Sequence, residues 1–81
     1  MNDTDHPIST VRAIVAEILA LGPHEIDDSA DLFDHYLADS LNLIEIVARV
    51  EKQFQVVLPL DGLPQARSIS ALCGLLTGQR A

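Results

Sequence analysis

Cysteine, tryptophan and basic residues are scarce in this 81-residue chain. The one cysteine, Cys73, cannot form an internal disulfide, so neither a disulfide framework nor an all-cysteine zinc site can brace the fold. Aromatic residues make up only 4% of the chain and Trp is absent, so the core must be aliphatic. Five Lys and Arg against twelve Asp and Glu give a formal net charge of −7. This charge argues against binding to nucleic acid or to an anionic membrane surface and favours basic partners.

The chain also has no long hydrophobic run. Its apolar stretches are far shorter than the about 18 residues that a membrane span needs, and its polar, acidic N-terminus is unlike a signal peptide. We therefore expect a cytoplasmic protein with no membrane span. We also expect residues 1–81 to form one domain and a monomer, rather than a multi-domain enzyme. Within it, residues 1–8 are predicted to be a flexible N-terminus and residues 78–81 a frayed C-terminus.

Apolar residues at helical spacing predict a first helix. They are Val11, Ile14, Val15, Ile18 and Leu19. Ser9 or Thr10 is placed to cap the start of this helix, and the pair Gly22-Pro23 is expected to end it. The segment that follows, residues 22–39, has no sustained period and holds six of the twelve acids. We expect a long loop with one helical turn near Ala30 to Tyr36 and with its apolar side chains tucked inward. Those side chains are Ile26, Leu32, Phe33, Tyr36 and Leu37.

Ser40 to Phe54 is the second predicted main helix, and its apolar arc is unusually wide. One stripe consists of Leu43, Val47, Val50 and Phe54. A second flank, next to Glu45, consists of Leu41, Ile44 and Ala48. Apolar positions therefore cover more than half of the circumference. Either several neighbours surround this helix, or one flank is kept for a partner.

Proline and glycine divide the rest of the chain. Pro59, Gly62 and Pro64 allow at most a short helix around Asp61 to Ala66, and Pro59 also interrupts the only β-like run, QVVLPL. Ser68 is predicted to cap a last main helix that Gly78 ends. The expected fold is therefore all-α: a small bundle of three main helices and one short helix, with a long loop between the first two.

The tripeptide Asp39-Ser40-Leu41 stands where the long loop enters the second helix. Serine is a good N-cap, and the Ser40 hydroxyl could simply accept a hydrogen bond from a first-turn amide. The setting is more distinctive, however, because an acid precedes the serine and an apolar residue follows it. The run DLFDHYLADSLNLIEIVARVEKQF, residues 31–54, closely resembles the acyl carrier protein family, whose mark is an Asp-Ser-Leu entering the second helix. The likeness extends over nearly the whole domain.

The resemblance implies that the protein is a carrier with no catalytic activity of its own. Ser40 would receive a 4′-phosphopantetheine arm from coenzyme A, transferred by a phosphopantetheinyl transferase. The thiol of the arm would hold an acyl group as a thioester for partner enzymes such as ligases, ketosynthases or acyltransferases. Asp39 would contact the transferase and its magnesium, although it could equally complement the helix dipole. Leu41, Glu45, Ala48 and Glu51 match positions that touch partner enzymes; for Leu41 and Ala48 the alternative is core packing.

The sequence departs from the family pattern on the second helix. Asn42 and Lys52 occupy positions that are often acidic in fatty-acid carriers, and Arg49 adds a second cation. This thinner acidic surface favours a specialised fatty acid, polyketide or related pathway. The phrase DLFD followed by LADSL also resembles discrete carriers of D-alanine, so an aminoacyl carrier, D-alanyl or peptidyl, is an alternative.

Two further hypotheses belong to other classes of protein. One is a non-enzymatic helical adaptor in which Ser40 is only a helix cap. The other is a metal-binding regulator, because residues 27–31 imitate the start of a calcium loop, but Leu32 and Ala38 stand where Gly and Glu are required. The histidines lack metal-ligand spacing, and Cys73 on an apolar helix face is typical of a small core residue. We therefore expect no metal site.

Overall fold

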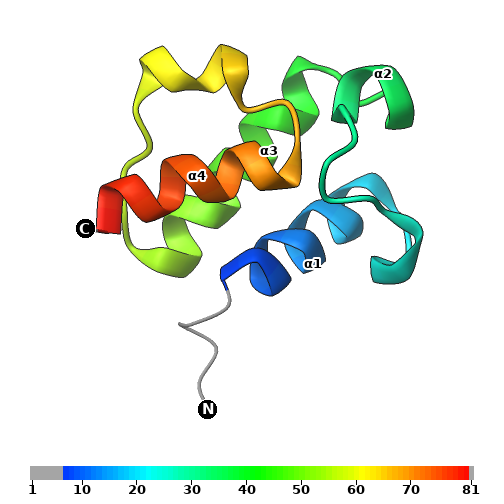
Figure 1. The fold of residues 1–81 in the computed structure, drawn as a ribbon, viewed down its shortest axis with the longest axis horizontal. Helices are drawn as coiled ribbons and strands as arrows, with labels where there is room; N and C mark the ends of the chain where they lie inside the picture. The colour runs from blue at the N-terminus through cyan, green and yellow to red at the C-terminus, as the bar shows by residue number, and fades with distance from the viewer. Residues whose placement is uncertain (1–6, 81) are drawn as a thin grey trace.

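Residues 7–80, which the computed structural model describes, form four α-helices and two short 3-10 helices joined by turns and loops (Figure 1). The elements are α1 (Pro7–Leu19), η2 (Pro23–Glu25), α2 (Leu32–Tyr36), α3 (Ser40–Phe54), η3 (Leu60–Gln65) and α4 (Ile69–Arg80). This part of the chain contains no strand, so the all-α bundle is confirmed, with α1, α3 and α4 as the main helices. None of its helices is both long and apolar enough to cross a lipid bilayer.

One aliphatic core holds the main helices together. Helix α1 packs against both α3 and α4, so its buried face is shared between them. The largest fully buried side chains are Leu32, Ile46, Leu58, Ile69, Leu72, Leu76, Val11, Val15 and Val50. No polar or charged residue is buried within the described ranges, and no aromatic side chain is fully buried there. The prediction of an aliphatic core is confirmed.

Helix α1 is bounded by residues that the sequence did not predict. It begins at Pro7, whose fixed φ suits the first position of a helix, so Ser9 and Thr10 lie inside the helix and neither caps it. It ends at Leu19, because Ala20 adopts a left-handed φ of 61° and the Leu21 amide donates to the Ala16 carbonyl at 2.8 Å. The expected end at Gly22-Pro23 is therefore wrong. That pair begins η2 instead.

The long loop folds around the short helix α2, as expected. Asp31 caps α2 by accepting hydrogen bonds from the amides of Phe33 and Asp34, both at 2.9 Å. Ile26 and Leu32 are buried, which confirms the inward packing predicted for them. Tyr36 is half-buried against the core and Phe33 is half-buried, whereas Leu37 is exposed, so the prediction is wrong for Leu37. Leu37 is the left-handed residue that ends α2, and its side chain is 84% exposed.

The last helix begins as predicted and ends later. The Ser68 hydroxyl accepts a hydrogen bond from the Ala71 amide at 3.1 Å, which confirms the predicted cap of α4. Helix α4 runs on to Arg80, however, so the predicted end at Gly78 is wrong. Glycine ends a helix when it turns left-handed, and Gly78 does not have a positive φ. Of the expected flexible ends, residues 1–6 and 81 lie outside the described residues, whereas Pro7 and Ile8 belong to α1.

Two arginines tie the acidic loop to the helices. Arg12 of α1 makes a two-pronged ion pair with Asp28, with nitrogen–oxygen distances of 2.7 and 2.6 Å. Arg67, just before α4, pairs with Asp31 at 2.6 Å and lies 4.7 Å from the centre of the Phe33 ring. The Arg67 carbonyl also accepts the Leu32 amide at 2.6 Å. Both ends of the segment 28–34 are therefore fixed to the bundle.

The Arg12–Asp28 pair predicts a loss of stability in acid. Hydrogen bonds from Arg12 hold the pKa of the Asp28 carboxyl below its usual 3.8. A carboxyl whose pKa is lower in the folded state stabilises the fold above its unfolded pKa, and this stability is lost as the pH falls through the folded pKa. We expect Arg12→Gln to lower the free energy of unfolding at pH 7 by about 1 kcal/mol and to reduce the further loss below about pH 4.

Urea unfolding of both proteins at pH 7 and pH 3 measures this effect. Arg49→Gln is the matched control, because it removes an ion pair with Glu17 whose side chains are 40% and 70% exposed, and exposed pairs contribute little. An acid dependence that is the same with and without Arg12 would contradict the prediction.

Candidate functional site

Ser40 is the first residue of α3, and it is not the cap of that helix. The Asp39 carboxylate accepts the Asn42 amide hydrogen bond at 2.9 Å, and the Asn42 side-chain oxygen accepts the Asp39 amide at 2.9 Å. These two bonds form a capping box that satisfies the donors usually served by a capping serine. The hypothesis that Ser40 is only a helix cap is therefore wrong, because Asp39 fills that role.

The groups around Ser40 suit a phosphodiester. The residue is exposed, and its hydroxyl makes no hydrogen bond to any residue within 7–80. The amides of Ser40 and Leu41 likewise have no partner within that range, as is usual for the first donors of a helix. Free amides and the positive end of the dipole of a 15-residue helix favour an anion at this position. The residues present therefore fit a phosphate-linked group on the Ser40 oxygen.

The second apolar flank of α3 faces outward. Leu41 is 74% exposed and Ile44 is 64% exposed, and Glu45 and Ala48 are exposed beside them. The opposite stripe of the same helix is directed into the bundle, with Val47 and Val50 buried. Core packing, the alternative considered for Leu41 and Ala48, is therefore wrong. Neighbouring helices leave this flank uncovered.

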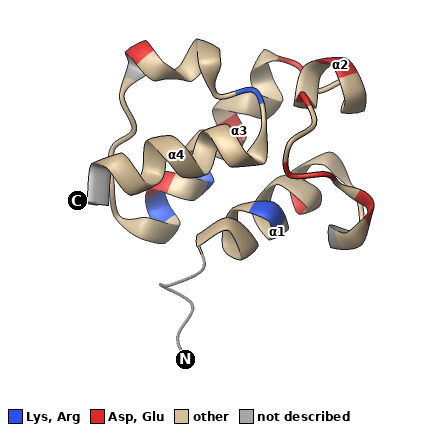
Figure 2. Ribbon diagram, viewed as in Figure 1, with Lys and Arg blue, Asp and Glu red and all other residues tan. Residues whose placement is uncertain are grey.

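The two cations of α3 differ in their surroundings. Arg49 donates to the Glu17 carboxylate of α1 at 2.6 Å, so its charge is balanced within the bundle. Lys52 is exposed and makes no ion pair with any residue in the described part of the chain. Figure 2 shows acidic segments along the loop and α2, up to the beginning of α3. The helix therefore presents an acidic end near Ser40 and a lone cation three turns further along.

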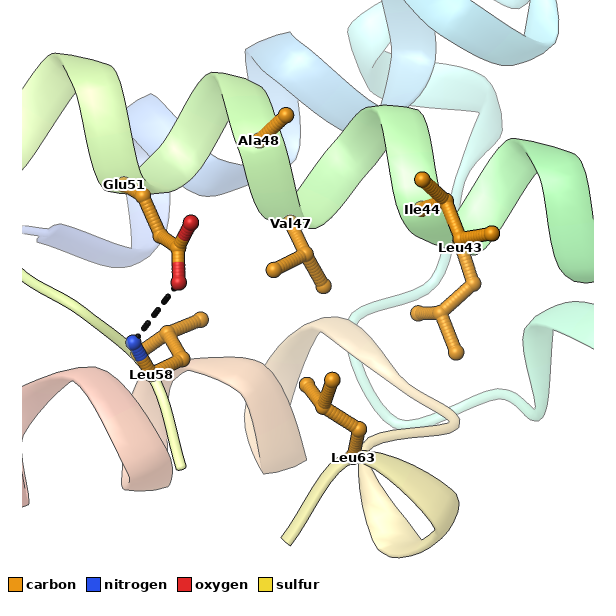
Figure 3. Close-up of a pocket in the computed structure, with 7 residues that line it drawn as sticks. All are labelled: Leu43, Ile44, Val47, Ala48, Glu51, Leu58 and Leu63. Atoms are coloured by element: carbon orange, nitrogen blue, oxygen red, sulfur yellow. Dashed lines mark hydrogen bonds between the residues drawn. The ribbon is translucent and has the colours of Figure 1, made fainter. Parts of the chain in front are cut away.

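An apolar pocket of about 280 Å³ opens between α3 and the segment that contains η3. Its lining consists of Leu43, Ile44, Val47, Ala48, Glu51, Leu58 and Leu63. Glu51 supplies the one charged side chain in that lining, and its carboxylate accepts the Leu58 amide hydrogen bond at 2.8 Å (Figure 3). Figure 3 shows Val47 and Glu51 pointing from α3 toward Leu58 and Leu63. Glu51 is therefore half-buried and engaged within the chain, unlike the exposed Glu45.

Cys73 and the acids of the imitation calcium loop contribute to the fold. Cys73 is half-buried against the core, and burial raises the pKa of its thiol, which keeps it protonated and unreactive. Within residues 7–80, no group of three or more His, Cys, Asp and Glu is arranged to hold a metal ion. The acids of the imitation calcium loop serve other roles, because Asp27 accepts the Ser29 amide at 2.8 Å and Asp31 caps α2.

Comparison with known proteins gives consistent matches. The model of the family described as "Phosphopantetheine attachment site" matches residues 9–76, a span that includes Ser40. Polyketide-8 synthase acyl carrier protein 2 of Streptomyces avermitilis is 35% identical over 69 residues, which cover 85% of this chain and 79% of that carrier. The acyl carrier protein of Zymomonas mobilis is 32% identical over 69 residues, which cover 85% of each chain.

A much larger protein also contains a similar segment. The non-reducing polyketide synthase pkiA of Emericella nidulans is 37% identical over 65 residues, which cover 80% of this chain but only 3% of the synthase. This chain therefore spans a small fraction of that relative and most of the length of the two bacterial carriers.

A family match over most of the chain, on an all-helical bundle with a free serine at the start of α3, defines the class. This chain belongs to the phosphopantetheine attachment site family, the acyl carrier proteins. It is a carrier and not an enzyme, and its cofactor is 4′-phosphopantetheine. When attached, this group supplies a thiol on which a carbonyl can be held as a thioester.

Proposed function

We propose that this protein carries acyl intermediates as thioesters on a 4′-phosphopantetheine arm attached to the Ser40 oxygen. In the loading step, Ser40 Oγ forms a bond to the pantetheine-side phosphorus of coenzyme A as the pyrophosphate bond breaks. Adenosine 3′,5′-bisphosphate leaves, and the hydroxyl proton passes to a base of the phosphopantetheinyl transferase. The observation that carries the proposal is the exposed Ser40 hydroxyl. Because Asp39 caps α3, this hydroxyl is not needed to hold the start of the helix.

We further propose that the loaded protein serves a specialised fatty acid or polyketide pathway in the cytoplasm. Its partners would then include ligases, ketosynthases or acyltransferases that contact the outward flank of α3. The exposed Leu41, Glu45 and Ala48 support such docking, because apolar side chains around one acid offer both burial and a site for a basic group. The named polyketide carrier among the relatives supports the choice of pathway.

Intact-mass measurement tests the attachment. The purified protein is incubated with coenzyme A, Mg²⁺ and a broad-specificity phosphopantetheinyl transferase. One phosphopantetheine per chain is expected, on the peptide that contains Ser40. An unshifted mass with several transferases, each active on a reference carrier, would overturn the proposal.

Asp39 is proposed to act twice, as the cap of α3 and as a negative charge that the transferase recognises through its magnesium. We expect Asp39→Ala to lower the free energy of unfolding by about 1 kcal/mol, because the Asn42 amide loses its acceptor. Asp39→Asn keeps a capping oxygen and removes the charge, so it should fold normally and load slowly. Thermal melts and loading rates separate the two roles. Normal loading of Asp39→Asn would contradict the recognition of the charge and leave capping of α3 as the role of Asp39.

A further inference from the structure

Leu37 is unfavourably placed for the fold alone. Its φ of 60° and ψ of 31° lie in the left-handed region, where the Cβ of an ordinary residue is crowded and where Gly or Asn is preferred. Its side chain is also the most exposed of the four large hydrophobic residues found on the surface of the described chain. A strained backbone and an unburied leucine both oppose stability. Backbone strain of this kind gathers at functional sites, where contacts with another molecule offset it.

The surroundings fix the position of Leu37 close to Ser40. Leu32, at the other end of α2, is 1% exposed and anchors the helix in the core. Leu37 stands three residues before Ser40, and Leu41 and Ile44 follow within the next helical turn. Three apolar residues therefore lie close to Ser40 in the chain: Leu37, Leu41 and Ile44. They come from the end of α2 and the start of α3, and all three are exposed.

We infer that Leu37 is a recognition residue for the phosphopantetheinyl transferase and inserts into an apolar pocket with a basic rim. This inference rests on the proposed function, because it requires that Ser40 be loaded. The transferase is favoured over other partners because it must bring a phosphorus atom to the Ser40 oxygen and so must cover the adjacent residues. Enzymes that act on the thiol work at the far end of the arm, and the contacts proposed for them lie on the outward flank of α3 and do not include Leu37 at the end of α2. The basic rim complements the exposed Asp39 carboxylate and the Asp34 carboxylate, which is 81% exposed and makes only a long ion pair of 3.8 Å with Arg67.

Three substitutions separate contact from backbone effects. Leu37→Gly removes the side chain and relieves the left-handed strain, Leu37→Asn keeps a Cβ and tolerates the same φ, and Leu37→Met keeps an apolar side chain. The matched control is Gln55→Gly, which relieves a left-handed φ of 56° at the other end of α3, away from Ser40. The assay is loading of the purified apo-protein from coenzyme A by a broad-specificity transferase, with kcat and KM determined by mass spectrometry.

We expect Leu37→Gly and Leu37→Asn to lower kcat/KM for loading about tenfold, chiefly by raising KM. Leu37→Met and Gln55→Gly should load within about twofold of the wild type. The melting temperature of Leu37→Gly should equal or exceed that of the wild type, by up to about 4 °C, because strain is relieved. Slower loading of both Leu37→Gly and Leu37→Asn, without lower stability, would show that the leucine contacts the transferase.

Two results would overturn the inference while leaving the proposed function intact. One is wild-type kcat/KM for Leu37→Gly. The other is slow loading of Leu37→Gly with normal loading of Leu37→Asn, which would assign the effect to backbone stiffness before Ser40. If the wild-type protein itself is never loaded, the proposed function fails and the inference fails with it.

Discussion

Replacing Ser40 with alanine abolishes formation of the loaded protein. The substitution removes the only atom on which the proposed phosphodiester can form, so the loss should be complete rather than partial. The fold should not change, because Asp39 caps α3 and the Ser40 hydroxyl makes no hydrogen bond within residues 7–80. We expect the free energy of unfolding to stay within about 0.5 kcal/mol of the wild type. Intact mass after incubation with coenzyme A and transferase, together with urea unfolding, measures both quantities.

Ser70→Ala is the matched control for this experiment. Ser70 is also an exposed serine in the first turn of a main helix, α4, and its amide donates to the Asp28 carbonyl at 3.0 Å. It lacks the preceding acid and the exposed apolar flank of Ser40. Ser70→Ala should load at the wild-type rate. An adduct on Ser40→Ala, or loss of loading in Ser70→Ala, would contradict the assignment of the attachment site.

Truncation of Leu32 to alanine gives the largest expected loss of stability. Leu32 is 1% exposed and joins the short helix α2 to the core. Leucine-to-alanine changes in cores cost about 2–5 kcal/mol, because buried area is lost and a cavity remains. A domain of this size has a total stability of only about 4–12 kcal/mol. A large part of the population of Leu32→Ala should therefore unfold in mild denaturant, as circular dichroism would show.

Leu41→Ala removes the same atoms from an exposed position and provides the comparison. Because Leu41 is 74% exposed, its truncation should change the free energy of unfolding by less than about 0.5 kcal/mol. Loading by the transferase should nevertheless become slower, since the outward flank of α3 loses apolar area next to Ser40. Equal destabilisation by Leu32→Ala and Leu41→Ala would refute the described burial of α2.

The sequence predicts the main helices well because their apolar spacing reflects the core that they share. The bounds of α3 follow from its period, and the start of α4 follows from the Ser68 cap. The left-handed residues that end the helices were not predictable, and this produced an error at the end of α1, where Ala20 stops the helix before Gly22. Ala20, Leu37 and Gln55 adopt this conformation without being glycine, so composition gives no signal, while Gly78, the expected stop, stays helical.

The candidate site could be predicted only in part from the sequence. Residue pattern identified Ser40, but serine and aspartate both cap helices well, so only the structure shows that Asp39 holds the cap. The pairing of Arg49 with Glu17 could not be foreseen, because those residues are far apart in the chain and meet only when α1 packs on α3. Arg67 over Phe33 is a similar long-range contact. Short-range patterns carry no information about such pairs.

The internal ion pairs of the arginines influence the rate at which the protein associates with its partners. Arg12, Arg49 and Arg67 are each matched to a carboxylate, so their charges cancel locally while most of the acidic excess lies on the loop and near Ser40. Such a field accelerates encounters with basic surfaces over distances of about 8 Å at physiological ionic strength. Added salt shortens this range. Association rates should therefore fall as ionic strength rises, while dissociation, governed by the apolar contacts, changes much less.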